Sequence, residues 1–191
     1  MYVYLAFYGI IISVFFVKKS PKMLFRLATL ADAANLRHLS ESTFRDTYTA
    51  FNTPENMEKH VNKNFTIEQL ERELQTPDSQ YFIIESDGVI IAFAKLVCNH
   101  TTPGLNEKRV VEIERFYVKR DFHGQQLGRK MMDFCMTWAK AQAFEVVWLG
   151  VWEHNPNAIA FYRRMGFEHF GEHTFVLGDE VQTDFVMKRA V

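Results

Sequence analysis

The sequence predicts a single α/β domain, and three observations carry this prediction. Residues 109–167 contain a strand, a turn, an amphipathic helix, a second strand and a short helix in one continuous unit. Apolar runs at residues 81–85 and 89–97 flank a Ser-Asp-Gly turn at 86–88, which is a strong hairpin signal. The 191 residues, 48% of them hydrophobic, suffice for one core, and no linker-like composition divides the chain.

The first part of the sequence of this domain predicts a strand followed by a helix. Residues 24–29 are the strand, and Thr29 or Asp32 can cap the helix, which extends toward Tyr48. The apolar side chains of the helix recur at helical spacing, at Ala33, Leu36, Leu39 and Phe44.

A second helix is predicted just before the hairpin. Residues 52–64 read as a polar segment, and residues 66–69 then form a start that resembles a capping box. The helix continues through Leu70 and Leu74 and ends at Pro77.

Strands and helices alternate after residue 110. A β-branched and aromatic strand at residues 110–118 stops at the charged residues 119–121. The turn at residues 123–128 then opens an amphipathic helix, and the next strand covers residues 146–151.

A short helix and two strands complete the domain. The apolar face of this helix is made of Ala158, Phe161, Tyr162 and Met165. Gly166 ends the helix, and strands are predicted at residues 174–177 and 183–188.

The turn at residues 123–128 has the features of an anion-binding site. A helix N-terminus presents unpaired N–H groups and a positive dipole end, which suit a pyrophosphate, and Gly124 and Gly128 leave room for its approach. The turn lacks both the Lys-Ser/Thr ending of a P-loop and the three glycines of a dinucleotide fingerprint. An ordinary strand-to-helix turn is therefore the alternative interpretation.

Residues 155–167 carry a more specific pattern. They read Asn-Pro-Asn-Ala-Ile-Ala-Phe-Tyr-Arg-Arg-Met-Gly-Phe and match, without a gap, the N-x-x-A-x-x-F-Y-x-x-x-G-F pattern of the GCN5-related N-acetyltransferase (GNAT) superfamily. The strand, turn, helix and strand before them follow the superfamily order. His123 stands where Arg or Gln is usual and Gln126 where Gly is usual, whereas Gly128 is kept.

The chain therefore resembles the GNAT superfamily. The resemblance implies a mixed, mostly antiparallel sheet of six or seven strands with helices on both faces. It also implies a parallel strand pair that splays apart at the site for acetyl-CoA, which serves as a co-substrate.

A narrower resemblance points to an acceptor. The segments E-I-E-R-F-Y-V and L-G-V-W-E-x-N, with the tail at residues 178–184, look like those of bacterial spermidine/spermine N-acetyltransferases of the PaiA type. This likeness covers the chain from about residue 23 to the end. It implies that a polyamine accepts the acetyl group.

The resemblance also assigns residues to the acetyl-CoA site. Main-chain groups of the first splayed strand pair with the pantetheine arm as another strand would. The residues implied in cofactor binding are Phe116, Tyr117, Val118, His123, Gly124, Gln125, Gln126, Leu127, Gly128, Asn155 and Tyr162. Tyr162 matches the tyrosine near the sulfur, where its phenol can donate a proton to the leaving thiolate. A core aromatic on an apolar helix face is the alternative for Tyr162.

Two glutamates are candidates for removing a proton from the amine. An alkylammonium group has a pKa near 10.4, so roughly one molecule in a thousand is nucleophilic at neutral pH. Period-two alternation places Glu112 and Glu114 on one face of their strand, opposite Ile113 and Arg115, where they can also attract a polycation. A solvated strand face paired with Lys or Arg is the alternative. Further negative charge is available from Asp179, Glu180 and Asp184.

Composition and residue spacing limit the kinds of partner and site that we expect. A net charge of −1 with interspersed signs gives no basic patch for nucleic acid. Cys98 and Cys135 have no C-x-x-C spacing, which fits a reduced cytoplasmic setting, and neither has the motif context of a covalent nucleophile. His169 and His173 flank a glycine outside any predicted helix, so no metal site is expected.

Residues 1–22 form an apolar N-terminal extension. Residues 2–17 are almost wholly apolar and a basic segment follows, which is compatible with a short membrane anchor facing the cytoplasm. The alternative, which we favour, is that translation begins at Met23 and that residues 23–191 are the acetyltransferase domain. A membrane partner is expected only if the extension is translated.

The sequence thus predicts an acetyl-CoA-dependent N-acetyltransferase that acts on a primary amine, a polyamine in the favoured interpretation, by direct attack in a ternary complex. Two alternatives stay open. The acceptor can be a protein N-terminus, an amino acid or an aminoglycoside, or the chain can be an acyl-CoA-binding module without efficient transfer. A homodimer is compatible with the sequence.

Overall fold

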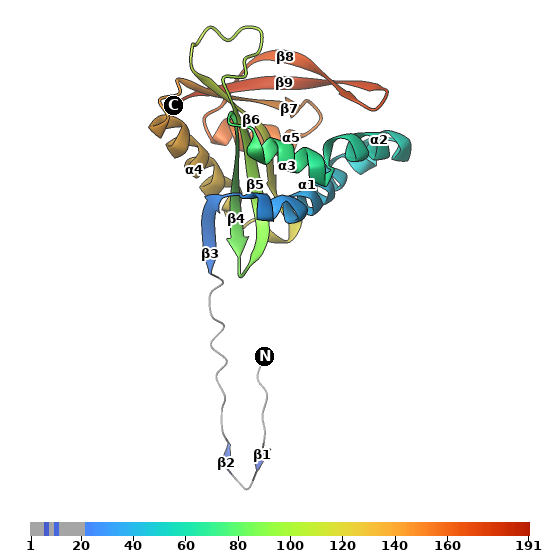
Figure 1. Ribbon diagram of the computed structural model, residues 1–191, viewed down its shortest axis with the longest axis vertical. Coiled ribbons are helices and arrows are strands. Elements are labelled where there is room, and N and C mark those ends of the chain that lie inside the picture. The colour runs from blue at the N-terminus through green and yellow to red at the C-terminus, as the bar shows by residue number, and fades with distance from the viewer. Residues whose placement is uncertain (1–5, 8–9, 12–21) are drawn as a thin grey trace.

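A seven-stranded sheet organises the protein, as the computed structural model shows for the residues it describes, 6–7, 10–11 and 22–191 (Figure 1). The strand order is β3-β4-β5-β6-β7-β9-β8. These strands are β3 (Met23–Leu27), β4 (Ser79–Ser86), β5 (Val89–Cys98), β6 (Val110–Val118), β7 (Val146–Trp152), β8 (Glu168–Leu177) and β9 (Glu180–Ala190). All neighbours are antiparallel except β6 and β7, so the predicted mixed sheet is confirmed.

Only a short piece of the N-terminal extension lies among the described residues. There β1 (Ala6–Phe7) and β2 (Ile10–Ile11) pair antiparallel. The rest of the predicted extension, and with it the choice between a later start and an anchor, lies outside the described residues. Within the described part of the chain, no helix has both the length and the apolar character that a membrane crossing needs.

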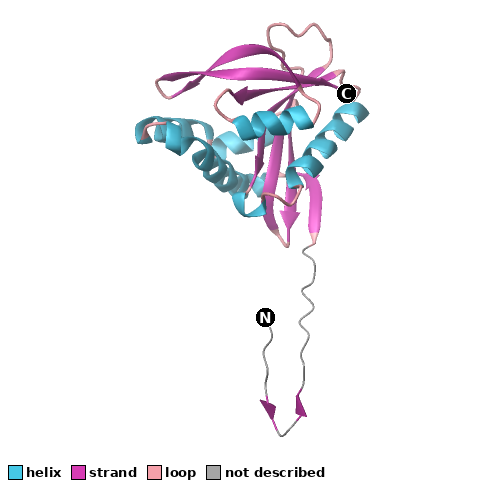
Figure 2. Ribbon diagram, turned by 180° about the vertical axis from the view of Figure 1, so that it is seen from behind, coloured by secondary structure: helices cyan, strands magenta, loops and turns pink. Residues whose placement is uncertain are grey.

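Helices cover both faces of the sheet (Figure 2). They are α1 (Ala33–Tyr48), α2 (Pro54–Asn64), α3 (Ile67–Gln75), α4 (Leu127–Ala141) and α5 (Pro156–Arg164), with short 3-10 turns at Leu30–Asp32, Thr49–Phe51 and Arg120–Phe122. Alternation along β4 assigns the faces, because Phe82 and Ile84 pack with α4 whereas Tyr81 and Ile83 pack with α1 and α3. The α4/α5 face holds the larger core, and the α1/α3 face holds a second one.

The predicted hairpin between β4 and β5 is confirmed. Ser86 pairs with Val89, and both residues between them, Asp87 at φ 49° and Gly88 at φ 85°, are left-handed. Two positive φ values are the signature of a type I′ turn, whose twist matches that of the strands.

The parallel pair splays, as the resemblance implied. Pairing between β6 and β7 covers only Val110 with Val146, Val111 with Val147 and Glu112 with Trp148. Beyond this point β7 pairs only with β9, although β6 continues to Val118. The edge of β6 that faces β7 is therefore open from residue 113 onward.

A β-bulge at Glu114 changes the faces that the sequence predicted for β6. Leu96 pairs with Ile113 and Lys95 pairs with Arg115, so Glu114 is the extra residue. The prediction that Arg115 lies opposite both glutamates is therefore wrong. Arg115 lies on the α1/α3 face, where it contacts the Glu114 side chain.

Most of the polar segment at residues 52–64, for which no helix was predicted, forms α2. The Thr53 hydroxyl caps this helix by accepting a hydrogen bond from the Asn56 N–H at 3.2 Å, and Pro54 occupies its first turn. Only Met57 and Val61 give the helix an apolar contact surface, and that pair was too sparse to predict it.

The strand predicted at residues 174–177 is longer in the structure and begins at Glu168. Pairing with β9 along its whole length holds this polar edge strand, apart from an irregularity between His169 and Gly171. Figure 1 shows the β8–β9 hairpin extending over α2.

Candidate active site

The open edge of β6 is the centre of the candidate site. Phe116, Tyr117 and Val118 pair with β5 on one side, and no strand pairs with them on the other. An extended ligand with alternating amide donors and acceptors can pair with such an edge. Phe116 points to the α4/α5 face, and Tyr117 packs against Phe93 on the α1/α3 face at 5.6 Å between ring centroids.

The predicted anion-binding turn lies directly beyond this edge. Gly124 and Gln126 have φ values of 77° and 59°, and α4 begins at Leu127. No described residue accepts a hydrogen bond from the N–H groups of residues 125–128. These groups, together with the positive end of the α4 dipole, suit the phosphates of acetyl-CoA.

Gly128 brings the turn close to the splayed strands. A Cβ atom at this position would lie 3.5 Å from the Phe161 ring and 3.9 Å from Phe116. His123 does not point into the site, because its Nε2 lies 2.8 Å from the Val118 carbonyl oxygen. The structure thus gives His123 a contact that fixes the turn to the end of β6.

Helix α5 brings two predicted residues to the other side of the gap. Asn155 caps the helix, and its Oδ1 accepts a hydrogen bond from the Ala158 N–H at 3.1 Å. Tyr162 lies about two turns further along the helix, buried against Phe116 and Phe167. Among the described residues its hydroxyl has no hydrogen-bond partner, whereas an ordinary core tyrosine usually has one.

Three phenols gather around the gap although they come from distant parts of the chain. Burial raises the pKa of Tyr162, and Tyr117 and Cys135 add to this shift. Burial also raises the pKa of Tyr117 to about 12, and that of Tyr48 well above its usual value, with Asp184 contributing to both. All three phenols therefore stay protonated near neutral pH and can donate hydrogen bonds.

Glu114 belongs to a set of paired charges under α3, which we call the closed charge network. Its members are Glu73, Tyr81, Lys95, Glu114 and Arg115. The Lys95 Nζ lies 2.8 Å from Glu114 and 3.2 Å from Glu73, and Arg115 binds Glu73 at 2.9 and 3.1 Å. Tyr81 donates a hydrogen bond to Glu73. Burial disfavours ionised Glu73, but the charges of Arg115 and Lys95 outweigh it and lower its pKa to about 2.

Glu112 lies on the same face of the sheet but outside that network. Its side chain is 10% exposed, and its carboxylate contacts the ring of His100. Burial raises the pKa of Glu112, against the effect of His100. The Trp148 indole donates to the His100 carbonyl at 2.8 Å and thus holds this loop beside β7.

His173 and Asp184 form a pair near Glu112. The His173 Nε2 lies 3.4 Å from the Asp184 Oδ2, and the two residues face each other between β8 and β9. The His173 ring reaches across β9 to β7, because a Cβ atom at Gly150 would lie 3.0 Å from its Cε1 and Nε2. We call Glu112, His173 and Asp184 the open cluster, since the imidazole is 32% exposed.

Aromatic rings border this cluster at the end of β7. Trp152 lies 5.6 Å from Tyr48 and 5.0 Å from Phe51, measured between ring centroids, and His154 lies 5.4 Å from it. Phe51 is 59% exposed. Aromatic faces beside carboxylates are well suited to a cationic amine.

The acidic residues Asp179 and Asp184 of the C-terminal segment have different surroundings in the structure. Asp179 pairs with Lys59 at 2.8 Å, and its N–H donates to the Asn56 Oδ1, so it ties the hairpin to α2. Asp184 is 16% exposed and belongs to the open cluster. His169 lies on the opposite face of β8, where it packs on Phe185.

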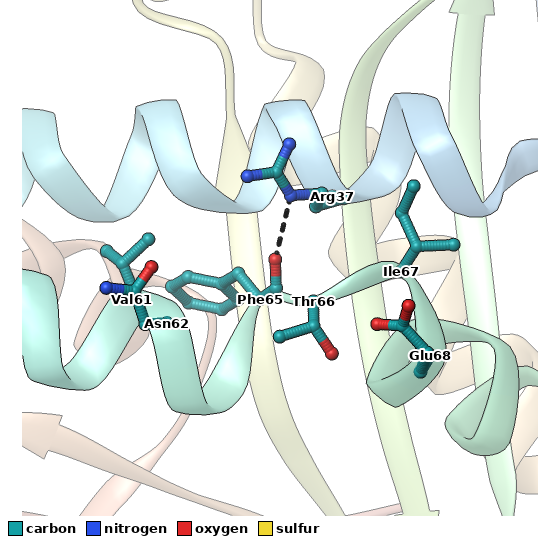
Figure 3. A pocket seen from close by; sticks show the side chains of 7 residues that line it. All are labelled: Arg37, Val61, Asn62, Phe65, Thr66, Ile67 and Glu68. Atoms are coloured by element: carbon teal, nitrogen blue, oxygen red, sulfur yellow. Dashed lines mark hydrogen bonds between the residues drawn. The ribbon is translucent and has the colours of Figure 1, made fainter.

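A shallow pocket of about 240 Å³ between α1, α2 and α3 is separate from this site (Figure 3). It is lined by Arg37, Val61, Asn62, Phe65, Thr66, Ile67 and Glu68. The Arg37 side chain donates to the Phe65 carbonyl at 3.0 Å and to Glu41 at 3.3 Å, so its guanidinium is already occupied. None of the predicted site residues lines this pocket.

Comparison with known proteins agrees with this geometry. The sequence pattern of the Acetyltransferase (GNAT) family matches residues 37–167. This chain belongs to the GNAT family. The matched segment contains the splayed strands, the turn and Tyr162, and the protein is an N-acetyltransferase that uses an acyl-CoA and an amine acceptor.

Individual relatives refine the picture. An uncharacterised N-acetyltransferase in the pepI 3′ region of Lactobacillus delbrueckii subsp. lactis is 37% identical over 153 residues, which cover 80% of this chain and 88% of that protein. The spermine/spermidine N(1)-acetyltransferase of Bacillus subtilis (strain 168) is 31% identical over 71 residues, covering 37% of this chain and 47% of that one.

A solved structure shows the same fold. The PaiA N-acetyltransferase from Thermoplasma acidophilum, crystallised in complex with coenzyme A, superposes with a TM-score of 0.72 at 18% identity. The match covers 89% of this chain and 99% of that one.

Sequence reasoning missed Tyr48, Trp152 and His173. Tyr48 ends a helix that looked like an ordinary amphipathic one, and Trp152 looked like a strand residue. His173 was considered only as a metal ligand. The signal that unites them is proximity between α1, β7 and β8, which appears only when the sheet order is known.

Proposed function

We propose that this protein transfers acetyl from acetyl-CoA to a primary amine of a polyamine such as spermidine or spermine, by direct attack in a ternary complex. The observation that carries the proposal is the open edge of β6 between the unpaired N–H groups of the turn and the unpartnered Tyr162 hydroxyl. This arrangement suits a pantetheine arm with phosphates at one end and a thioester at the other.

The proposed acetyl-CoA site uses the residues predicted for it. The main chain of Phe116, Tyr117 and Val118 pairs with the pantetheine amides, and the N–H groups of residues 124–128 bind the pyrophosphate. Asn155 keeps its Nδ2 for the ligand, because its Oδ1 caps α5. His123 acts through the turn, which it ties to Val118.

Tyr162 is the proposed acid. Free thiols and phenols have pKa values of about 8.5 and 10. Burial raises the pKa of Tyr162 further, so the phenol holds its proton until negative charge develops on the sulfur. A donor aimed at charge that appears only in the transition state stabilises that state more than the ground state.

Glu112 and Glu114 are the proposed acidic residues on the acceptor side. Both lie on the α1/α3 face, where their charge attracts an ammonium group. Glu112 is the better proton acceptor of the two, because burial raises its pKa, whereas Lys95 and Arg115 already neutralise Glu114.

The lining of the site and the names of two similar proteins support a polyamine as acceptor. Asp184 and the rings of Tyr48, Phe51 and Trp152 lie at the same end of β7. The Bacillus subtilis relative is named for spermine and spermidine, and the Thermoplasma structure is a PaiA protein. A polyamine offers a second ammonium group to this surface while the first one reacts.

The same proposal includes the setting of the enzyme. Residues 23–191 form the acetyltransferase domain, and the enzyme works in the cytoplasm, where the free thiols of Cys98 and Cys135 persist. Neither thiol is a nucleophile in this scheme, since burial raises the pKa of both.

Thiol release from acetyl-CoA by purified residues 23–191 tests the proposal. Spermidine, spermine, an aminoglycoside, free amino acids and a peptide N-terminus are assayed in parallel at saturating acetyl-CoA. We expect saturable release with the polyamines. Release with another acceptor alone would overturn the polyamine assignment, and binding of CoA without release for any amine would overturn catalysis.

A further inference from the structure

The proposed reaction leaves one proton without a clear acceptor. The attacking ammonium must lose a proton before its nitrogen has a lone pair, and the acceptor must lie within hydrogen-bond reach of it. Glu114 is held by Lys95 and Arg115, and Glu112 is buried beside His100 with a side chain only 10% exposed. The His173 imidazole is the most exposed member of the open cluster, at 32%.

Asp184 gives this imidazole a defined orientation. The His173 Nε2 lies 3.4 Å from the Asp184 Oδ2. A carboxylate beside Nε2 favours the tautomer with its proton on that nitrogen, which leaves the lone pair on Nδ1. A carboxylate that fixes one ring nitrogen and leaves the other as acceptor is an arrangement suited to general-base catalysis.

Gly150 explains how the ring reaches the site from β8. With no Cβ on β7, the ring occupies space that any other residue would fill, since that atom would lie 3.0 Å from the Cε1 and Nε2 of His173. Gly150 is two residues beyond the last paired position of β7 with β6. The imidazole therefore lies beside the start of the gap.

We propose that His173, oriented by Asp184, is the general base that removes the proton from the acceptor ammonium. This inference rests on the proposed function and assigns a residue to it. Glu112 supports the imidazole by its negative charge, and the aromatic rings around Trp152 hold the substrate in place.

The proposed reaction moves two protons in addition to the acetyl group. The ammonium transfers one proton to Nδ1 of His173, and the freed lone pair attacks the thioester carbonyl carbon. The carbon–sulfur bond breaks, the thiolate takes the Tyr162 proton, and the second proton of the attacking nitrogen returns to the phenolate. The imidazolium finally releases its proton to solvent, so the products are the acetamide, the thiol and one proton.

The surroundings of His173 fix the sign of its pH dependence. The contact with Asp184 raises the pKa of His173 against burial, and the charge of Glu112 adds to this shift. The other titratable groups facing this region are Tyr48, Tyr117 and His100, from α1, β6 and the loop before β6. The base is active when neutral, so kcat should fall as the pH drops below the raised pKa.

The test compares kcat against pH, with acetyl-CoA and spermidine saturating, for wild type and three variants. His173→Gln should lose roughly 10²-fold or more in kcat and lose the acid limb of the profile. Asp184→Asn should shift that limb to lower pH, because a carboxylate that stabilises the imidazolium is gone. His169→Gln, on the opposite face of the same strand, is the matched control and should behave as wild type.

A second readout does not depend on turnover. An NMR titration of the His173 ring should give a pKa above the usual 6.5 in wild type and a lower one in Asp184→Asn. An acid limb and turnover that persist in His173→Gln would overturn the inference, and would do so in favour of Glu112 if Glu112→Gln abolished them. Wild-type silence with every amine would overturn the proposed function as well, so the two failures are distinguishable.

Discussion

The closed charge network and the open cluster lie on the same face of the sheet, a few residues apart along β6, yet they are built in opposite ways. In the closed charge network Lys95 and Arg115 balance Glu73 and Glu114, and Tyr81 completes the hydrogen bonds. In the open cluster two carboxylates share the neighbourhood of one partly exposed imidazole, and three nearby phenols have no partner among the described residues.

This difference separates charged groups that stabilise the fold from charged groups that can interact with a substrate. A buried ion pair whose members are all satisfied resists change, because removing one member leaves the other uncompensated. Groups with unused hydrogen-bonding capacity can instead be satisfied by a substrate. The bulge at Glu114 is the boundary between the two regions, since it turns Arg115 toward α3 while Glu112 stays beside the splayed strands.

The largest expected effect comes from breaking the closed charge network. Arg115→Met leaves Glu73 buried without its main cation, and we expect a loss of about 3–5 kcal/mol in the free energy of unfolding. Urea and thermal unfolding of purified protein measure it. Lys130→Met on the exposed side of α4 is the control, because Lys130 has no ion pair among the described residues. A loss below about 1 kcal/mol for Arg115→Met would mean that the network is not structural.

Low pH should also weaken the closed charge network, and the expected loss in unfolding free energy is slightly smaller than that for Arg115→Met. The pKa of Glu73 is about 2 in the folded state and near 4.3 unfolded, so the unfolded chain takes up its proton first as pH falls. The stabilisation, about 3 kcal/mol, is present above pH ~4.3 and disappears toward pH ~2. Unfolding free energies measured across this window in wild type and Glu73→Gln check it, since the variant should show a shallower dependence. Equal slopes would contradict the assignment.

Tyr162→Phe tests the candidate active site, and we expect it to lower turnover with little change in stability, the reverse of Arg115→Met. The hydroxyl has no described partner, so its removal should leave the unfolding free energy within about 0.5 kcal/mol of wild type. We expect kcat to fall about 10²-fold, equivalent to about 2.7 kcal/mol of transition-state stabilisation, while acetyl-CoA affinity changes little. Steady-state kinetics with calorimetric titration of CoA separates the two. Unchanged turnover would remove Tyr162 from the mechanism.

The sequence predicts the features that neighbouring residues determine, and it does not predict the features that tertiary contacts determine. Local signals predicted the hairpin between β4 and β5 and the limits of β6, because each depends on neighbouring residues. The bulge at Glu114 could not be predicted from the sequence, because it depends on pairing with β5. Helix α2 was missed because tertiary contacts stabilise it more than its own periodicity does.

Sequence patterns reach only the proposed acetyl-CoA side of the candidate site. The turn and Tyr162 lie within one continuous segment whose pattern is specific. The acceptor side joins Tyr48 with residues near position 180, and no periodicity links positions that far apart. Glu114 shows the consequence, because alternation placed it correctly beside Glu112 but could not show that Lys95 neutralises it.

Gly150→Ala perturbs the open cluster without changing any charge. The added Cβ would lie 3.0 Å from the His173 ring and 3.3 Å from the Asp184 Oδ2, so the imidazole must move by a few tenths of an ångström. We expect kcat to fall about tenfold, or about 1.4 kcal/mol, with the position of the acid limb nearly unchanged. Gly171→Ala, where nothing lies within 4 Å of an added Cβ, is the control. Wild-type kcat in Gly150→Ala would mean that the ring position is not limiting.

The smallest effect, and the one that tests the boundary itself, is expected for Glu114→Gln. Its carboxylate is 34% exposed and reaches both Lys95 and Arg115, so stability should fall by no more than about 1 kcal/mol. If Glu114 also acts on the acceptor, kcat/KM should fall several-fold for spermidine and less for a monoamine, and the pH optimum should rise. Parallel pH profiles with both amines measure this, with Glu112→Gln for comparison. An unchanged profile would assign Glu114 wholly to the closed charge network, and the boundary would then lie between Glu112 and Glu114.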